Sequence, residues 1–147
     1  RQYLCKGEYF SLPSSKSKYV THLVYPPPLQ ELTGLGIHLT KTLDGRLRLG
    51  PNAIYLESEN YSVDSARAAS FYKAVYPFLP FIELQALEPA MAGIRPKLSG
   101  PGEPFRDFVI TEESDRGFPG FFNLIGIESP GLTCALSIAR YLSEMLC

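Results

Sequence analysis

The chain has 147 residues, a length that suits one domain with a hydrophobic core of its own. Apolar residues make up 45% of the sequence and charged residues 20%, as in ordinary globular proteins. The formal net charge of −1 gives no electrostatic case for binding nucleic acid or an anionic membrane, and no apolar run approaches the ~20 residues that span a bilayer.

The cysteines and histidines indicate neither a disulfide framework nor a metal site. Cys5, Cys134 and Cys147 are odd in number and widely spaced, which favours a reducing compartment. His22 and His38 have no acidic motif between them, so we expect no metal. The first ten residues also lack the shape of a signal peptide. We therefore predict an intracellular and cytoplasmic location.

The N-terminal segment has the composition of β-structure. The sequence predicts a strand over residues 3–12, a turn over 13–18 and a second strand over 19–25. Three consecutive prolines at 26–28 stop the second strand. Because the chain opens directly on a strand, we expect it to be a piece of a larger protein.

Residues 35–50 carry the clearest hairpin signal, since Asp44-Gly45 is typical of tight turns. A two-residue loop would mix apolar and polar side chains on each face. A three-residue loop over 43–45, with Gly45 left-handed, gives each face one character, which is what fixes strand register. The two faces would then hold Ile37, Leu39, Leu47 and Leu49 on one side, and His38, Thr40, Thr42, Arg46 and Arg48 on the other. We predict the three-residue loop, with His38 on a polar face that in many antiparallel sheets is simply solvated.

The central segment predicts a helix and a strand with an unusual charge. Asp64 is expected to cap a helix over 65–78, with a short helical turn within 81–89. Residues 90–98 are predicted to form an apolar strand that contains Arg95. An unpaired buried charge is costly, so Arg95 needs an anion. Either an internal Asp or Glu or a ligand carboxylate meets that need.

The C-terminal quarter predicts two strands and a closing helix. Strands are expected over 107–111 and 121–127, with a polar turn at 112–120 between them. Ser129 suits an N-cap and Pro130 the first helical position, and the apolar stripe that follows predicts a helix buried on most sides. Free N–H groups at its start, with Gly131 close by, would suit an electron-rich ligand atom. A plain strand–helix packing unit explains the same pattern.

No phosphate-binding loop is recognisable. Gly34-Leu35-Gly36 lacks the third glycine of a GxGxxG fingerprint and leads into a strand instead of a helix. Gly100-Pro101-Gly102 fails for the same reasons. The sequence therefore predicts no cradle for a pyrophosphate.

Six motifs, taken in order, resemble one family. They are KGEYF at 6–10, GIHLT at 36–40, DGRLRLGPNA at 44–53, AGIRPKL at 92–98, DFVI at 107–110 and NLIGIESPGLTCALSIA at 123–139. In this order they resemble the C-terminal part of L-2-hydroxyglutarate dehydrogenases and oxidases, which are FAD enzymes of the D-amino-acid-oxidase-type fold. The resemblance covers nearly the whole chain, but the N-terminal Rossmann half of such enzymes has no counterpart in it.

The resemblance implies roles for individual residues. Arg95 would bind the substrate carboxylate and Arg48 a second carboxylate. His38 would take the hydroxyl proton as hydride leaves for the flavin, since an imidazole exchanges protons near neutral pH. The turn at 130–133 would face the flavin edge on which negative charge builds. The cofactor-binding residues implied in this way are Gly93, Pro130, Gly131, Leu132 and Thr133.

We predict an α+β fold: a mostly antiparallel sheet with flanking helices, plus a C-terminal strand–helix that would complete a flavin-binding domain. Residues 1–98 are expected to form the substrate-binding sheet domain, and 99–147 the C-terminal segment of the FAD-binding domain. The expected function is FAD-dependent oxidation of a small 2-hydroxy acid such as L-2-hydroxyglutarate. An amino-acid oxidase or a non-catalytic binding module are the alternatives.

The expected partners follow from the same reasoning. They are a small carboxylate substrate, the missing N-terminal dinucleotide-binding domain, and a second copy of the chain through its apolar helix. FAD is expected to be held incompletely, so this chain alone is expected to be inactive. We expect no nucleic acid and no membrane span.

Overall fold

The computed structural model describes residues 1–27 and 36–146. Pro28, Gly34, Leu35 and Cys147, which figured in the sequence predictions, lie outside these ranges. The chain divides into two compact units, Lys6–Ile94 and Arg1–Cys5 with Arg95–Cys147. The predicted division into residues 1–98 and 99–147, with the functions assigned to the two parts, stays a prediction.

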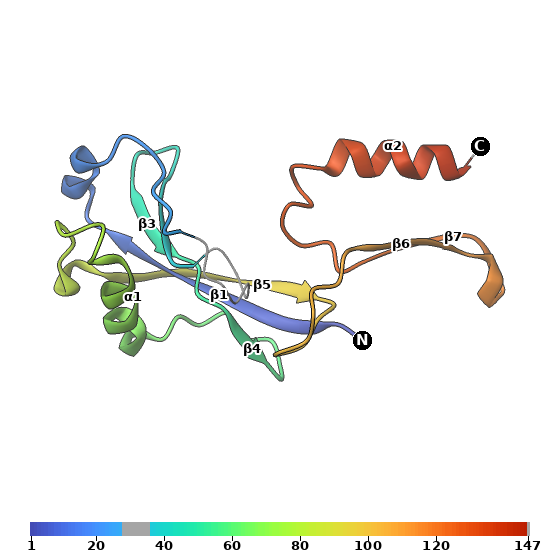
Figure 1. The fold of residues 1–147 in the computed structure, drawn as a ribbon, viewed down its shortest axis with the longest axis horizontal. Helices are drawn as coiled ribbons and strands as arrows, with labels where there is room; N and C mark the ends of the chain where they lie inside the picture. The colour runs from blue at the N-terminus through green and yellow to red at the C-terminus, as the bar shows by residue number, and fades with distance from the viewer. Residues whose placement is uncertain (28–35, 147) are drawn as a thin grey trace. The chain divides into compact units, whose positions relative to one another are not determined.

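A five-stranded sheet is built around the long first strand (Figure 1). Its order is β2 (His38–Lys41), β3 (Leu47–Gly50), β1 (Tyr3–Leu12) and β4 (Ile54–Leu56), and β5 (Glu88–Lys97) also pairs with β1. The β1/β3 and β2/β3 pairs are antiparallel. The predicted strand over residues 3–12 is confirmed, as is the α+β class with a mostly antiparallel sheet.

The hairpin of β2 and β3 has the predicted register. Leu39 pairs with Leu49, and Thr40 pairs with Arg48. The amide of Thr42 donates to the carbonyl of Arg46 at 2.8 Å, which closes a three-residue loop with Gly45 at φ +83°. The apolar face of the hairpin is buried at Leu39, Leu47 and Leu49, so the choice of loop from face consistency is confirmed.

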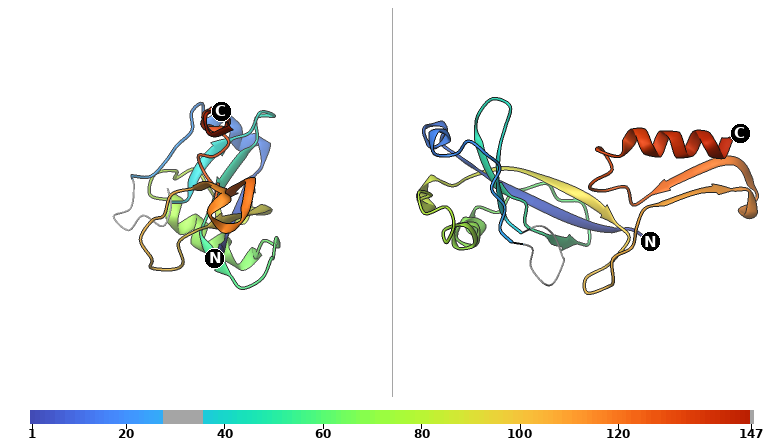
Figure 2. Two further views of the ribbon diagram at one scale, coloured as in Figure 1. Left: turned by 90° about the vertical axis from the view of Figure 1, so that its right-hand side faces the viewer. Right: turned by 45° about the horizontal axis from the view of Figure 1, so that its top comes forward.

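The core lies between this apolar face and helix α1 (Ala68–Val75), which is drawn beside the sheet in Figures 1 and 2. Phe10 of β1 and Phe71 of α1 meet with ring centroids 4.7 Å apart. The carboxylate of Asp64 accepts from the amide of Ala66 at 3.0 Å, so the predicted cap is confirmed. Short 3-10 helices complete this unit: η1 (Ser14–Tyr19), η2 (Ser65–Arg67) and η3 (Leu84–Ala86).

The predicted second strand over 19–25 is wrong. Helix η1 extends through Tyr19, and Val24 alone bridges to Leu39. Val20 is buried in the core, and the ring of Tyr19 stacks on Phe81 at 5.2 Å between centroids. The alternating apolar residues of this segment therefore serve side-chain packing instead of a strand ladder.

The second unit contains a separate two-stranded sheet. Strands β6 (Val109–Glu113) and β7 (Phe118–Ile125) pair antiparallel around η4 (Ser114–Arg116). The predicted polar turn at 112–120 is therefore shorter than expected. Glu112 holds it together, because its carboxylate accepts from the amides of Ser114 and Gly120 at 2.9 and 2.6 Å. These backbone hydrogen bonds lower the pKa of Glu112.

Helix α2 (Ala135–Leu146) begins later than predicted. The amide of Gly131 donates to the carbonyl of Glu128, and the amide of Cys134 donates to that of Pro130. Ser129 and Pro130 thus lie in a turn before the helix, so their expected roles as N-cap and first helical residue are wrong.

No residue of α2 is buried, so the expected burial on most sides is wrong within this chain. Ile138, Leu142 and Met145 are half-buried on one side of the helix, whereas Leu136 and Leu146 are exposed. Figures 1 and 2 show α2 running beside the β6–β7 hairpin of its own unit. Among the described helices, none is both long and apolar enough to cross a membrane.

Candidate functional site

The residues predicted for the site fall in both units. His38, Arg48 and Gly93 belong to Lys6–Ile94, whereas Arg95 and the turn at 130–133 belong to the other unit. The geometry of each group is described separately.

His38 opens β2 opposite Gly50 and is packed instead of solvated. Its side chain is buried, and its ring stacks on Tyr25 with centroids 4.3 Å apart. The Nδ1 atom lies 2.9 Å from the carbonyl oxygen of Gly36. Because a carbonyl only accepts, we assign the proton of the neutral ring to Nδ1, which leaves Nε2 as the proton acceptor.

Arg48 lies on the same sheet face as His38. It pairs with Thr40, two residues along the strand from the His38–Gly50 pair, so the two side chains are diagonal neighbours. Its Nη1 donates to the Sδ of Met91 at 3.3 Å. Within the part of the chain that the structure describes, Arg48 forms no ion pair. This face is opposite the one that packs on α1.

Gly93 leaves open space on β5. A Cβ built at this position meets no heavy atom within 4 Å. Gly93 follows Met91 by two residues, so alternation along the strand places it on the face that Arg48 reaches. The structure thus brings His38, Arg48 and Gly93 to one face of the five-stranded sheet.

A buried polar network, which the sequence did not predict, stabilises the opposite face. Glu8 is fully buried, and its carboxylate contacts Lys6 Nζ at 2.9 Å, Asn52 Nδ2 at 3.0 Å and Arg67 Nε at 3.3 Å. The Oδ1 atom of Asn52 also accepts from the amide of Glu8 at 2.8 Å. The sequence did contain a signal for this network, because Lys6 and Glu8 are two residues apart and therefore lie on the same face of one strand.

Burial alone would raise the pKa of Glu8. Hydrogen bonds from Lys6, Asn52 and the amide of Asp64 outweigh it, so the pKa of Glu8 lies below its ordinary value. Glu8 is therefore held as a carboxylate inside the unit and ties β1 to the segments that carry Asn52 and Asp64.

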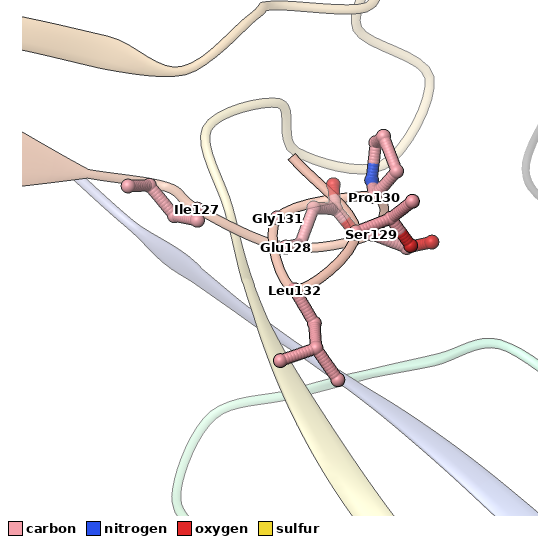
Figure 3. Close-up of a pocket in the computed structure, with 7 residues that line it drawn as sticks. Ile127, Glu128, Ser129, Pro130, Gly131 and Leu132 are labelled. Atoms are coloured by element: carbon pink, nitrogen blue, oxygen red, sulfur yellow. The ribbon is translucent and has the colours of Figure 1, made fainter. Parts of the chain in front are cut away.

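The turn at 127–133 lines a pocket of about 480 Å³ (Figure 3). Gly131 is required by the turn itself, because a Cβ there would lie 2.4 Å from Ile127 Cγ2. The side chain of Leu132 extends away from the turn in Figure 3. The amides of Leu132 and Thr133 donate no hydrogen bond to any described residue. Two N–H groups beside a pocket fit an electron-rich ligand edge.

The guanidinium of Arg95 contacts a buried cysteine of the same unit. Its Nη2 donates to the Sγ of the fully buried Cys5 at 3.6 Å. Two residues further on β5, Lys97 Nζ pairs with Glu128 Oε1 at 3.2 Å. Lys97 and Glu128 were not singled out from the sequence, although both lie in motifs that carried the resemblance. The carboxylate-binding role of Arg95 stays a prediction.

These residues fit a flavin edge but not a whole dinucleotide. The turn at 130–133 offers backbone donors, whereas no glycine-rich loop between a strand and a helix occurs in the described ranges. No group of three or more metal-ligating side chains occurs among the residues described.

Comparisons with known proteins identify the family of the chain. The family model described as FAD dependent oxidoreductase matches residues 1–145. The mitochondrial L-2-hydroxyglutarate dehydrogenase of Arabidopsis thaliana is 40% identical over 149 residues, which cover 95% of this chain and 30% of that protein. The L-2-hydroxyglutarate dehydrogenase of Salmonella houtenae is 26% identical over 172 residues, covering 93% of this chain and 40% of that protein.

A solved structure shares the fold. Dithionite-reduced L-alpha-glycerophosphate oxidase from Mycoplasma pneumoniae with FAD bound aligns with a TM-score of 0.70 and 22% identity, over 95% of this chain and 35% of that one. The chain thus spans between 30% and 40% of the length of these relatives. On the match to its family model, the chain belongs to the FAD dependent oxidoreductase family.

Proposed function

We propose that this chain belongs to an enzyme that oxidises a small 2-hydroxy acid with FAD. Its five-stranded sheet binds the substrate, and its turn at 130–133 faces the flavin. L-2-hydroxyglutarate is the leading substrate, because two relatives carry that name. The observation that carries the proposal is the sheet face shared by His38 and Arg48. It places a proton acceptor beside a cation that forms no ion pair with any described residue.

His38 is the proton acceptor in this proposal. With Nδ1 donating to the carbonyl of Gly36, Nε2 is free of a proton and accepts the one that leaves the substrate hydroxyl. FAD, when bound, supplies the acceptor for the hydride that leaves C2, so the products are the 2-oxo acid and reduced flavin. The stacked ring of Tyr25 keeps the imidazole in one orientation.

The two arginines bind the substrate. Arg95 binds the C1 carboxylate with two parallel hydrogen bonds, which lysine cannot copy. Arg48 binds the second carboxylate of a dicarboxylic acid. Gly93 contributes an open position on β5 where a larger side chain would occupy the space.

The turn at 130–133 holds the cofactor edge. The free amides of Leu132 and Thr133 would hold the electron-rich edge of the flavin, as backbone donors do in other sites where negative charge develops. The residues described here offer no pyrophosphate cradle, so we propose that this chain alone holds FAD incompletely and is inactive.

Substrate choice in the flavin-loaded enzyme, in which the chain is completed by the missing dinucleotide-binding domain, tests the proposal. His38→Gln is expected to lower kcat by about 100-fold or more, the usual scale for a lost general base. Arg48→Gln should raise KM for L-2-hydroxyglutarate and leave KM for 2-hydroxybutyrate, which lacks the second carboxylate, within about threefold. An equal rise in KM for both substrates would show that Arg48 does not bind the second carboxylate.

Two further substrates separate the alternatives. Turnover of glycerol 3-phosphate or of an amino acid, with none of L-2-hydroxyglutarate, would assign a different substrate class. A protein that binds these acids without reducing its flavin would favour the non-catalytic module. Arg95→Ala should cost about 2–5 kcal/mol in kcat/KM with normal flavin content, as for a desolvated charge pair.

We also propose an intracellular, cytoplasmic location. The thiols of Cys5 and Cys134 are free, which suits a reducing compartment. The Arabidopsis relative is named as mitochondrial, so fractionation of cells into cytosol and mitochondria is the deciding measurement.

A further inference from the structure

We propose that the Lys97–Glu128 ion pair positions the flavin-facing turn on the end of strand β5. The inference rests on the proposed function, since it concerns how the turn at 130–133 is held for the cofactor. Lys97 and Glu128 are positioning residues and touch neither substrate nor flavin in this proposal.

The first step is the ion pair itself. Lys97 Nζ lies 3.2 Å from Glu128 Oε1, with 17% of the lysine side chain and 12% of the glutamate side chain exposed. Surface pairs contribute little because water screens them and both side chains must be ordered. A largely desolvated pair is different, since removing one partner leaves the other charge without compensation.

The second step is a close contact beside the pair. Leu98, the residue after Lys97, is buried, and it lies against Gly126. A Cβ at Gly126 would lie 2.4 Å from Leu98 Cγ, so this contact requires glycine. The residues at the end of β5 therefore hold the segment before the turn by an apolar contact and by a charge.

The third step connects Glu128 to the free amides. The carbonyl oxygen of Glu128 accepts from the amide of Gly131, so the same residue is bound through its side chain and its backbone. Leu132 and Thr133 follow Gly131 directly. A shift of Glu128 therefore moves the two free N–H groups with it.

Little else in the described residues holds the turn. Ser129, Pro130, Leu132 and Thr133 are exposed, and α2 after them has no buried residue. Backbone donors act on developing charge only when they are held within a fraction of an ångström. We infer that the ion pair and the Leu98–Gly126 contact supply that restraint.

The test compares Glu128→Gln with Glu144→Gln. Glu144 pairs with Arg140 at 2.9 Å, but both side chains are exposed, so it controls for the loss of a carboxylate from the same unit. Lys97→Gln is the second variant and removes the other partner of the ion pair. The reversed pair, Lys97→Glu with Glu128→Lys, should restore part of the restraint.

Amide hydrogen exchange is the first readout, because it does not depend on activity. The hydrogen-bonded amides of Gly131 and Cys134 should exchange about tenfold faster in Glu128→Gln and in Lys97→Gln, and at the original rate in Glu144→Gln. Recovery in the reversed pair would assign the effect to the interaction itself. Unchanged exchange in both single variants would overturn the proposal.

Kinetics of the flavin-loaded enzyme, completed by the missing dinucleotide-binding domain, are the second readout. Loosened donors should lower kcat about tenfold and change the flavin absorption spectrum, with substrate KM kept within about threefold because Arg95 is untouched. A rise in KM with unchanged kcat and spectrum would overturn the proposal. If the unmodified chain, completed by the missing dinucleotide-binding domain, binds no flavin or oxidises no 2-hydroxy acid, the proposed function fails. The exchange rates still decide whether the Lys97–Glu128 ion pair restrains the turn.

Discussion

The two units of the molecule use the same kinds of residue in different ways. In Lys6–Ile94 the apolar residues of β1, the hairpin and α1 meet one another, and Phe71 is fully buried. In the unit with Arg95–Cys147, Phe121 and Leu124 of β7 and Leu136 of α2 are exposed, the last by 87%. An apolar stripe therefore predicts a buried surface, but not whether the chain itself provides the cover.

Charged residues differ between the units in a similar way. Glu8 lies inside its unit with three side-chain partners, whereas Arg140 and Glu144 form an exposed pair on α2. The Lys97–Glu128 pair is the more protected one in the second unit. We expect the free energy of unfolding to depend on side chains of the first unit far more than on those of the hairpin and α2.

The largest expected effect compares two phenylalanines. Phe71→Ala removes a ring that packs on Phe10 in the core and should lower the free energy of unfolding by about 3–5 kcal/mol. Phe121→Ala removes an exposed ring and should change it by less than about 0.5 kcal/mol. Urea unfolding followed by circular dichroism measures both. Similar losses in the two variants would mean that Phe121 is covered in solution.

The next effect concerns the buried carboxylate. Glu8→Gln leaves Lys6 in the interior without its anion and should cost about 3 kcal/mol of unfolding free energy. Glu144→Gln is the matched control, and it should cost less than about 0.5 kcal/mol because its ion pair is exposed. A neutral outcome at Glu8 would show that the network contributes no stability.

The pH dependence of stability compares Glu8 of the first unit with Glu112 of the second. The folded-state pKa of Glu8 is lowered, so its contribution is present above the unfolded pKa of about 4.3 and is lost as pH falls through the folded pKa. Stability should therefore fall below about pH 5, and less steeply in Glu8→Gln. Glu112→Gln tests the counterpart in the second unit, whose pKa is also lowered by backbone hydrogen bonds. Parallel curves for wild type and Glu8→Gln would contradict the role of Glu8.

Much of the first unit was predictable because its signals are local. Asp44-Gly45 and the alternation of Ile37 to Leu49 determine the loop length and the register without knowledge of any other segment. Asp64 caps its helix for the same reason. The segment at 19–25 was mispredicted because its alternation arises from contacts with distant Phe81 and the core, which a local pattern does not reveal.

The sequence predicted which residues belong to the candidate site, but only part of their geometry. Register placed His38 and Arg48 on one face, whereas the stacking on Tyr25 and the bond to the carbonyl of Gly36 depend on the path of the chain before β2. The start of α2 was missed because hydrogen bonds within the turn, at Glu128 and Pro130, use the positions that a cap would need. Lys97 and Glu128 pair across 31 residues of sequence, beyond the reach of any local pattern.

The smallest effect on stability tests the exposed face of α2 most directly. Leu136 is almost fully exposed, so Leu136→Glu should change the free energy of unfolding by less than about 0.5 kcal/mol. The same change removes an apolar side chain from the surface and should lower both the binding of an apolar dye and the self-association of the chain at high concentration. Ser137→Glu is the control, because it adds the same charge to the next residue of the helix without removing apolar surface. Dye fluorescence and sedimentation should fall with Leu136→Glu and stay closer to wild type with Ser137→Glu. A loss of 2 kcal/mol or more in Leu136→Glu, on the scale of a core substitution, would mean instead that this side chain is packed within the chain, and the contrast between the two units would disappear.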